Sequence, residues 1–158
     1  MLQIRKMEVS DVEDASVIVA AHSKIDGKLA AEYYTNYFAD PQRLSSDRER
    51  NFVGICDDSI VGVVGFCFDK YCSPDILWLN WFYVHPNYRR RGIGRDLLKY
   101  VLDEARSLGV RKMYLDTSSD ISYAPAVALY ERFGFREEGR LLDYYGHGEH
   151  YLIMGLVL

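Results

Sequence analysis

The stretch from Ile76 to Ser107 constrains the fold most, because its hydrophobic pattern changes abruptly at one loop. Ile76–Val84 is apolar at almost every position, which is typical of a central strand covered on both faces. A Pro/Asn break follows, then three arginines and two glycines. Gly94–Ser107 then places apolar residues at helical spacing on one face and is expected to end near Gly109. This strand–loop–helix order predicts an α/β protein.

The flanking segments predict a mixed α/β sheet. Ser10 is a plausible N-cap, with Glu13 completing a capping box, and a second helix is expected from about Lys28 to Ala39. A last helix is expected between Pro125 and Gly134. We expect a single domain over residues 1–158. The further expected strands are Met1–Met7, Asn51–Cys56, Ile60–Phe68, Lys112–Thr117, Arg136–Asp143 and His150–Leu158.

Composition argues against several function classes. The net charge is −4, so nucleic-acid binding has no general electrostatic support. The three cysteines, Cys56, Cys67 and Cys72, match no metal or redox spacing, and we expect reduced thiols and no metal. No apolar stretch is long enough to span a bilayer, and charges near the N-terminus interrupt any secretion signal. The expected location is therefore cytoplasmic.

The arginine–glycine loop between strand and helix suits a phosphate group. Free N–H groups at a helix start, the helix dipole and nearby guanidinium charge together favour an anion. The loop lacks the Lys-Ser/Thr of a nucleotide P-loop and the third glycine of a dinucleotide fingerprint. A pyrophosphate is the expected ligand, and a solvated basic turn is the alternative.

Two stretches of the chain resemble the GNAT family of N-acetyltransferases, which use acetyl-coenzyme A. The family has Gln/Arg-x-x-Gly-x-Gly/Ala after a Val-x-Pro-x-Tyr/Phe-Arg lead, and later Ala-x-x-Leu-Tyr-x-x-x-Gly-Phe. The two stretches here are Val84-His85-Pro86-Asn87-Tyr88-Arg89-Arg90-Arg91-Gly92-Ile93-Gly94 and Ala126-Val127-Ala128-Leu129-Tyr130-Glu131-Arg132-Phe133-Gly134-Phe135. The order of the expected elements also matches the family over the whole chain.

The resemblance implies a fold and a set of coenzyme-binding residues. The implied fold is a mixed sheet of about seven strands flanked by about four helices, with a splayed central strand pair. The main chain of the strand end would pair with the pantetheine arm, and the loop would bind the pyrophosphate. The implied coenzyme-binding residues are Phe82, Tyr83, Val84, Arg89, Arg90, Arg91, Gly92, Ile93, Gly94, Arg95 and Tyr130.

The resemblance also implies the chemistry. An amine of the substrate attacks the thioester directly, and Tyr130 would donate a hydrogen bond or a proton to the departing thiolate. The amine must be neutral to attack, so a general base is useful, and the candidates are Asp116 and His85. Each of the three could instead be purely structural. One departure is Tyr123, where many relatives have an Asn that contacts the pantetheine; Ser119, Ser122 or main chain could replace it.

The acceptor is the least determined part of the prediction. The resemblance places acceptor choice in the first two helices and the last hairpin, where Tyr144 and Tyr145 could flank an entering peptide. Asn80, Trp81 and Tyr83 could also shape the acceptor side. We expect a small-molecule amine (a polyamine, amino acid or antibiotic-like amine), with a peptide or protein N-terminus as the alternative. A non-catalytic acyl-coenzyme A-binding module is the alternative of another class, and a homodimer along the last strands is left open.

Overall fold

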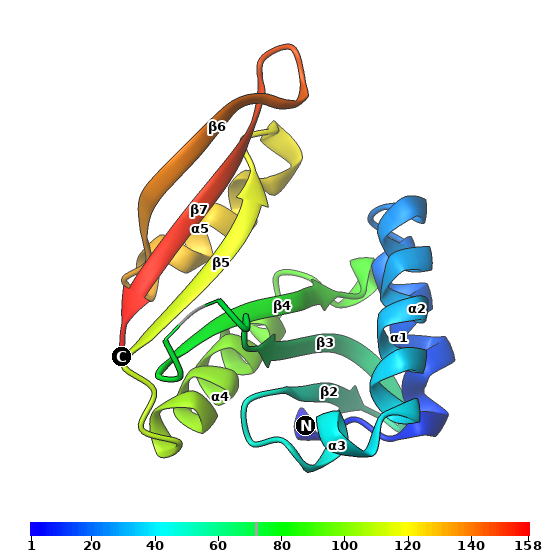
Figure 1. Cartoon of the computed structure of the whole chain (residues 1–158). Coiled ribbons are helices and arrows are strands. Elements are labelled where there is room, and N and C mark those ends of the chain that lie inside the picture. The colour runs from blue at the N-terminus through cyan, green and yellow to red at the C-terminus, as the bar shows by residue number, and fades with distance from the viewer. Residues whose placement is uncertain (72) are drawn as a thin grey trace. The chain divides into compact units, whose positions relative to one another are not determined.

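The computed structural model describes residues 1–71 and 73–158, and one of the three expected thiols, Cys72, lies outside them. The strands form one mixed seven-stranded sheet in the order β1-β2-β3-β4-β5-β7-β6 (Figure 1). The strands are β1 (Gln3–Lys6), β2 (Arg50–Cys56), β3 (Ser59–Cys67), β4 (Ile76–Val84), β5 (Lys112–Ser118), β6 (Arg136–Gly146) and β7 (Glu149–Val157). The helices are α1 (Val12–Ala20), α2 (Lys24–Ala39), α3 (Pro41–Ser45), α4 (Ile93–Ser107) and α5 (Ala124–Arg132). The expected mixed α/β sheet is confirmed.

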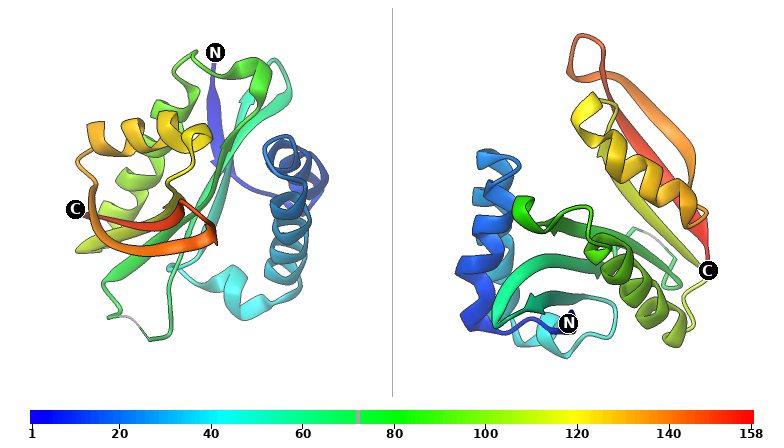
Figure 2. Two further views of the ribbon diagram at one scale, coloured as in Figure 1. Left: turned by 90° about the horizontal axis from the view of Figure 1, so that it is seen from above. Right: turned by 180° about the vertical axis from the view of Figure 1, so that it is seen from behind.

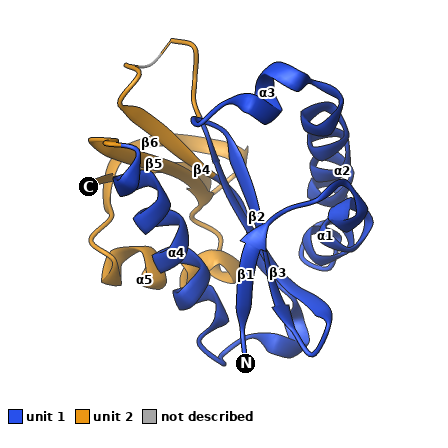
Figure 3. Ribbon diagram, turned by 90° about the horizontal axis from the view of Figure 1, so that it is seen from below, with its two compact units in different colours: residues 1–67, 80–108 blue, residues 68–79, 109–158 orange. Residues whose placement is uncertain are grey.

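The chain divides into two compact units, and β4 belongs partly to each (Figure 3). Unit 1 comprises residues 1–67 and 80–108, and unit 2 comprises residues 68–79 and 109–158. The expectation of a single domain stays a prediction, and each unit is described by itself. No helix within the described residues is both long and apolar enough to cross a membrane.

In unit 1, helices cover both faces of the strands. Figures 2 and 3 show α1 and α2 side by side on one face and α4 on the other. Val53 and Val63 belong to the core beneath α1 and α2. On the opposite face, the Leu97 side chain of α4 lies over Gly54 and Gly62, where a Cβ would come within 3.2 and 2.6 Å of it. Side chains therefore alternate between two helical layers, as the strand period requires.

Unit 2 consists of β5, β7 and β6 with α5 against one face (Figures 1 and 2). β5 pairs antiparallel with β7, and the first residues of β4 pair parallel with β5, from Ile76 opposite Lys112 to Trp78 opposite Tyr114. The splay of the central strand pair stays a prediction. β6 lies at the edge of the sheet, and its residues are almost all exposed.

The start of the first helix differs from the sequence-based expectation. Ser10 is not an N-cap, because it lies inside a 3-10 turn over Val9–Asp11. Glu8 caps that turn, and the Asp11 carboxylate accepts both the Glu8 N–H at 2.7 Å and two hydrogen bonds from Arg5. The Arg5 ion pair fixes Asp11, so the capping box forms two residues earlier than predicted.

Three further features of the fold differ from the sequence-based expectation. α2 starts at Lys24 rather than Lys28, because Ser23 caps it by accepting the Asp26 N–H. α2 ends at Ala39 as expected, and Pro41 starts the short helix α3, which was not predicted from the sequence. β4 is only partly buried, since Leu77 and Leu79 alone among its residues are classed as buried, whereas both faces were expected to be covered.

Candidate functional site

The loop between β4 and α4 has the geometry of an anion-binding helix start. Gly92 is the N-cap of α4 and has a φ of +84°, a conformation that favours glycine. The first intrahelical bond runs from the Asp96 N–H to the Gly92 carbonyl at 3.0 Å. The N–H groups of Ile93, Gly94 and Arg95 therefore precede the helical ladder and lie at the positive end of the dipole. These are the groups that the sequence analysis expected to bind a pyrophosphate.

The three arginines of this loop and Arg95 in the first turn of α4 have different surroundings. Arg89 donates from Nε to the Val84 carbonyl at 3.1 Å and so holds the end of β4. Arg91 lies 5.1 Å from the ring centre of Tyr88. Arg95 pairs with Asp96 at 2.9 Å. The exposed Arg90 side chain makes no hydrogen bond or ion pair within the described part of the chain, and the Arg90 backbone has a φ of +59°. Arg90 is thus the arginine whose charge is least committed to the fold.

The end of β4 is tied to its neighbours through main chain and side chains. Phe82, Tyr83 and Val84 are all half-buried. The Tyr83 hydroxyl donates to Asp26 Oδ2 at 3.2 Å, which joins β4 to the first turn of α2. His85 accepts the Asn87 N–H at Nδ1, so this imidazole caps the turn that follows the strand. That capping role is the structural alternative which the sequence analysis left open for His85.

Unit 2 holds the two residues predicted to act in catalysis. Tyr130 is buried near the end of α5 and packs edge-on against Phe135, with ring centres 5.9 Å apart. Burial raises the pKa of the Tyr130 phenol, and the negative charge of Asp116 raises it further. Asp116 is exposed on β5, opposite Ile153. The Asp116 charge also raises the pKa of the Tyr151 phenol, so Tyr130 and Tyr151 both stay protonated at neutral pH.

The hairpin between β6 and β7 carries an aromatic cluster. Tyr144 and Tyr151 have ring centres 5.0 Å apart, and Tyr145 lies 5.0 Å from Tyr144 and 6.1 Å from Tyr151. Tyr144 and Tyr145 are 59% and 49% exposed, so their rings are available for contact with a ligand. Burial first, and then the Asp116 charge, raises the pKa of Tyr151 to about 12.

The two serines proposed to replace the missing Asn are both engaged locally. Ser122 donates from Oγ to Asp120 Oδ1, and its N–H donates to the same atom at 2.9 Å. Ser119 accepts the His150 N–H at 2.8 Å. The Asp120 carboxylate thus caps the turn that contains Ser122, and Ser119 joins the end of β5 to β7. A replacement contact at the Tyr123 position therefore stays a prediction.

A polar cluster in unit 1 was only partly visible in the sequence. Asn80, expected on the acceptor side, donates to the Tyr33 hydroxyl of α2 at 3.0 Å, and that hydroxyl donates to Glu49 at 2.6 Å. Arg43 donates to both carboxylate oxygens of Glu49. Glu49 is only 5% exposed, and no sequence signal marked it, because it lies in a charged run that predicts a solvated loop.

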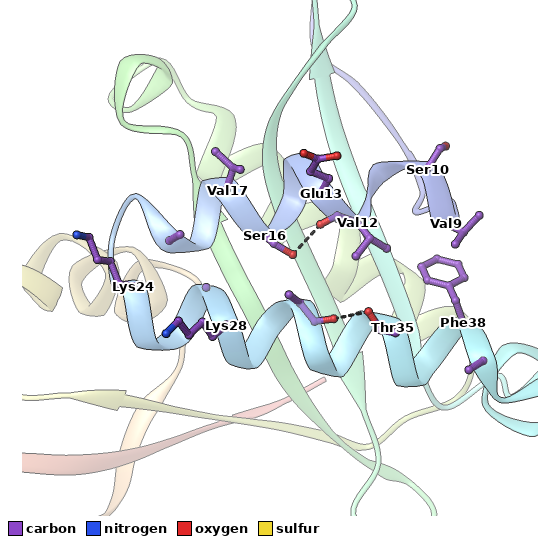
Figure 4. A pocket seen from close by; sticks show the side chains of 14 residues that line it. Val9, Ser10, Val12, Glu13, Ser16, Val17, Lys24, Lys28, Thr35 and Phe38 are labelled. Carbon is purple, nitrogen blue, oxygen red and sulfur yellow. Dashed lines mark hydrogen bonds between the residues drawn. The ribbon is translucent and has the colours of Figure 1, made fainter.

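A groove also runs between α1 and α2 on the side away from the sheet (Figure 4). Lys24 and Lys28 lie at one end of it, and Val9 and Phe38 at the other. It contains none of the residues predicted to bind the coenzyme or to act in catalysis. Its floor consists of small side chains and Gly27, where a Cβ would lie 2.4 Å from that of Ala20.

Comparison with known proteins identifies the family. Residues 18–135 match the sequence profile of the acetyltransferase (GNAT) family, a stretch that includes both the arginine–glycine loop and Tyr130. The chain belongs to this acetyltransferase family. The resemblance inferred from the two sequence stretches is thereby confirmed.

Curated GNAT relatives include proteins of assigned and unassigned substrate. The ribosomal protein bS18 alanine N-acetyltransferase of Escherichia coli K12 is 42% identical over 62 residues, which are 39% of this chain and 40% of that protein. The aligned part thus spans about two fifths of that relative's length. The uncharacterized N-acetyltransferase YjgM of the same strain is 27% identical over 150 residues, covering 91% of this chain and 87% of YjgM.

Solved GNAT structures share the fold over nearly the whole chain. An acetyltransferase of the GNAT family from Desulfovibrio desulfuricans superimposes with a TM-score of 0.89 and 23% identity, covering 99% of both chains. The ribosomal-protein-S18-alanine N-acetyltransferase of Escherichia coli superimposes with a TM-score of 0.79 and 25% identity, covering 99% of this chain and 94% of that one. The GNAT fold expected from the sequence is therefore confirmed.

Proposed function

We propose that this protein is an acetyl-coenzyme A-dependent N-acetyltransferase that acetylates a primary amine. The observation that carries the proposal is the start of α4, which lies inside the stretch that matches the GNAT family. Gly92 caps this helix start, its first N–H groups have no partner within the helix, and arginines lie beside it. That geometry suits the pyrophosphate of coenzyme A. Among relatives of the same fold, an aminoglycoside 6′-N-acetyltransferase was solved with coenzyme A.

Each part of the coenzyme has proposed partners in unit 1. The N–H groups of residues 90–95 would bind the pyrophosphate, with Gly92 and Gly94 allowing close approach. Arg90 would add a charge-assisted bond, because its exposed side chain makes no hydrogen bond or ion pair within the described residues. The main chain of Phe82, Tyr83 and Val84 would pair with the pantetheine amides as an added strand.

Tyr130 is the proposed partner of the leaving sulfur. Attack of a neutral amine on the thioester carbonyl forms the C–N bond, and the C–S bond then breaks to release the coenzyme A thiolate. The pKa of the Tyr130 phenol is raised, while that of a thiol is about 8.5. The phenol would therefore stabilise the thiolate by donating a hydrogen bond. The nitrogen, which has become cationic, would lose one proton to a base, and the thiolate would take up one proton from solvent, so the transfer balances.

Asp116 is the proposed general base for this nitrogen. Its carboxylate is exposed and acts electrostatically on Tyr130, so it belongs to the same part of unit 2. Removing the amine proton through water would suit a carboxylate in this setting. His85 is the weaker candidate, because its Nδ1 is already an acceptor within the turn.

The proposed acceptor is a small-molecule amine, with one alternative that a specific observation favours. The exposed aromatic cluster of Tyr144, Tyr145 and Tyr151 could flank an extended peptide. This feature, together with the matches to alanine N-acetyltransferases acting on a ribosomal protein, favours a protein N-terminus as the second candidate.

The proposed location of the protein is the cytoplasm, where acetyl-coenzyme A is available.

Two assays test the proposal in turn. In a thermal-shift comparison, acetyl-coenzyme A should raise the melting temperature where ATP and NAD do not. A thiol-release assay over polyamines, amino acids, aminoglycosides and Ala-initiated peptides should then find an acceptor. Selective stabilisation without turnover on any amine would favour a non-catalytic acyl-coenzyme A-binding module. Equal stabilisation by all three ligands would contradict the proposal.

A further inference from the structure

The middle of β4 breaks the alternation of side chains that a strand requires. Trp81 has a φ of +45°, although it is an aromatic residue inside a strand. Asn80 contacts Tyr33 of α2 through a hydrogen bond, and the neighbouring Trp81 packs against the same Tyr33 ring, with centres 5.8 Å apart. Two successive residues therefore face the same helix, which is the mark of a bulge in the strand.

This bulge immediately precedes the main chain proposed to pair with the pantetheine. A bulge bends the strand and re-aims the residues that follow it. Downstream of Trp81, the Tyr83 side chain again faces α2 through Asp26, and the His85 N–H rejoins β3 at the Val61 carbonyl at 2.8 Å. The direction of the Phe82–Val84 main chain thus depends on how Trp81 is held.

Tyr33 fastens the bulge to a buried charge pair. Its hydroxyl accepts from Asn80 Nδ2 at 3.0 Å and donates to Glu49 Oε1 at 2.6 Å. Arg43 holds Glu49 from the other side and also lies 5.0 Å from the centre of the Tyr33 ring. The Tyr33 phenol is therefore held by one accepted hydrogen bond, one donated hydrogen bond and the adjacent Arg43 guanidinium.

The polar residues around this contact are not explained by stability. Asn51, 3% exposed, is buried with no hydrogen-bond partner for either amide atom in the described structure, and Asn80 Oδ1 is likewise unpartnered there. Both amide oxygens face Gly65, where a Cβ would lie 2.5 Å from one and 2.6 Å from the other. Unpaired buried amides are costly, so apolar residues would stabilise this face of the sheet better. Polar residues at such a place specify one arrangement of the chain.

We propose that Tyr33 and Asn80 are positioning residues, which set the bulge at Trp81 and thereby aim the Phe82–Val84 main chain at the coenzyme. This role rests on the proposed function, since it concerns the binding of acetyl-coenzyme A. Neither residue touches the reacting atoms. Both act through the direction of β4, so their loss changes coenzyme affinity while the protein remains folded.

The test compares Tyr33→Phe with its neighbour Tyr34→Phe. Tyr34 is on the same helix and its ring also packs against Trp81, at 6.4 Å, but its buried hydroxyl has no partner within the described residues. Both variants lose one hydroxyl, and only Tyr33→Phe loses hydrogen bonds, to Asn80 and to Glu49. Amide hydrogen exchange of residues 80–85 and the dissociation constant for acetyl-coenzyme A are measured where every variant is fully folded.

We expect Tyr33→Phe to speed amide exchange in residues 80–85, with exchange in β2 and unit 2 unchanged. We also expect it to weaken acetyl-coenzyme A binding by about tenfold, which is the net contribution of about one hydrogen bond. Tyr34→Phe should leave both quantities within about twofold of wild type. Asn80→Ala should reproduce the effects of Tyr33→Phe on exchange and on affinity, and the double variant should be no worse in either than Tyr33→Phe, because all three break the Tyr33–Asn80 contact.

The outcomes separate this inference from the proposed function. Unchanged exchange at residues 80–85 in Tyr33→Phe, or equal effects of Tyr33→Phe and Tyr34→Phe, overturns the positioning role. A wild-type protein that binds no acetyl-coenzyme A overturns the proposed function, and the exchange measurement still decides whether Tyr33 holds the bulge. If Tyr33→Phe does not fold, Asn80→Ala carries the same test, because it leaves the Tyr33–Glu49 hydrogen bond in place.

Discussion

Replacing Tyr34 with Phe should make this protein more stable, although Tyr34 is completely buried. Its side chain is 0% exposed, and its hydroxyl has no hydrogen-bond partner among the described residues. Burial raises the pKa of this phenol, so the hydroxyl is protonated at neutral pH. Phe keeps the ring contacts with Tyr33 and Trp81 and removes only the unsatisfied atom.

The magnitude follows from the two adjacent tyrosines. A buried hydroxyl without a partner costs about 1–3 kcal/mol, so Tyr34→Phe should stabilise by about 1 kcal/mol after the small void is counted. Tyr33→Phe removes a hydrogen bond to the buried Glu49 carboxylate, whose side chain is 6% exposed, and should destabilise by about 1.5–3 kcal/mol. For a chain of this size, about 2–4 °C per kcal/mol gives a gap of roughly 5–15 °C between the two variants.

Urea unfolding and differential scanning calorimetry at neutral pH measure both variants directly. The expected order of the unfolding midpoints is Tyr34→Phe first, wild type next and Tyr33→Phe last, with unchanged m-values. A Tyr34→Phe protein less stable than wild type would show that the Tyr34 hydroxyl is satisfied in solution. It would refute the reasoning from the unpartnered oxygen.

Three further expectations follow from single contacts. Gly27→Ala should destabilise the protein by about 1–3 kcal/mol, although Ala has the better helix propensity. The added Cβ would lie 2.7 Å from the Ala20 main chain and would push α1 away from α2. An unchanged free energy of unfolding in chemical denaturation would contradict that packing. The hydrogen bond from Arg111 lowers the pKa of Asp75 from 3.8 to about 2, so its stabilising effect is complete above pH 3.8 and disappears as the pH falls through 2. Asp75→Asn should therefore flatten the pH dependence of the urea midpoint in that window, and parallel curves would exclude the contact as a source of acid sensitivity. Tyr130→Phe should lower kcat at least tenfold while changing acetyl-coenzyme A affinity less than threefold. Such a loss means that the transition state is about 1.4 kcal/mol or more less stable, while the bound substrate is little affected. An unchanged kcat in steady-state kinetics would remove Tyr130 from the mechanism.

Local sequence patterns were enough to predict the elements whose ends are marked by glycine, proline or asparagine. β4 was predicted with its observed bounds, because an apolar run bounded by a Pro/Asn break is unambiguous. Gly109 and Gly134 have φ values of +70° and +99°, as expected of residues that follow a helix end. The predicted Ser10 cap was wrong because Arg5, six residues before Asp11 in the chain, pairs with the Asp11 carboxylate and so moves the turn.

The sequence by itself determined the family and the α4 loop, because a glycine-capped helix start with adjacent arginines is a local pattern of backbone conformation and charge. The tertiary structure decided what no local pattern could specify. It placed Asn80 and Trp81 on one side of a strand, buried Glu49 from a charged loop, and gave Tyr33 a partner that its neighbour Tyr34 lacks. These features depend on contacts between residues 16 to 47 positions apart in the chain, so only the packed protein brings the groups together.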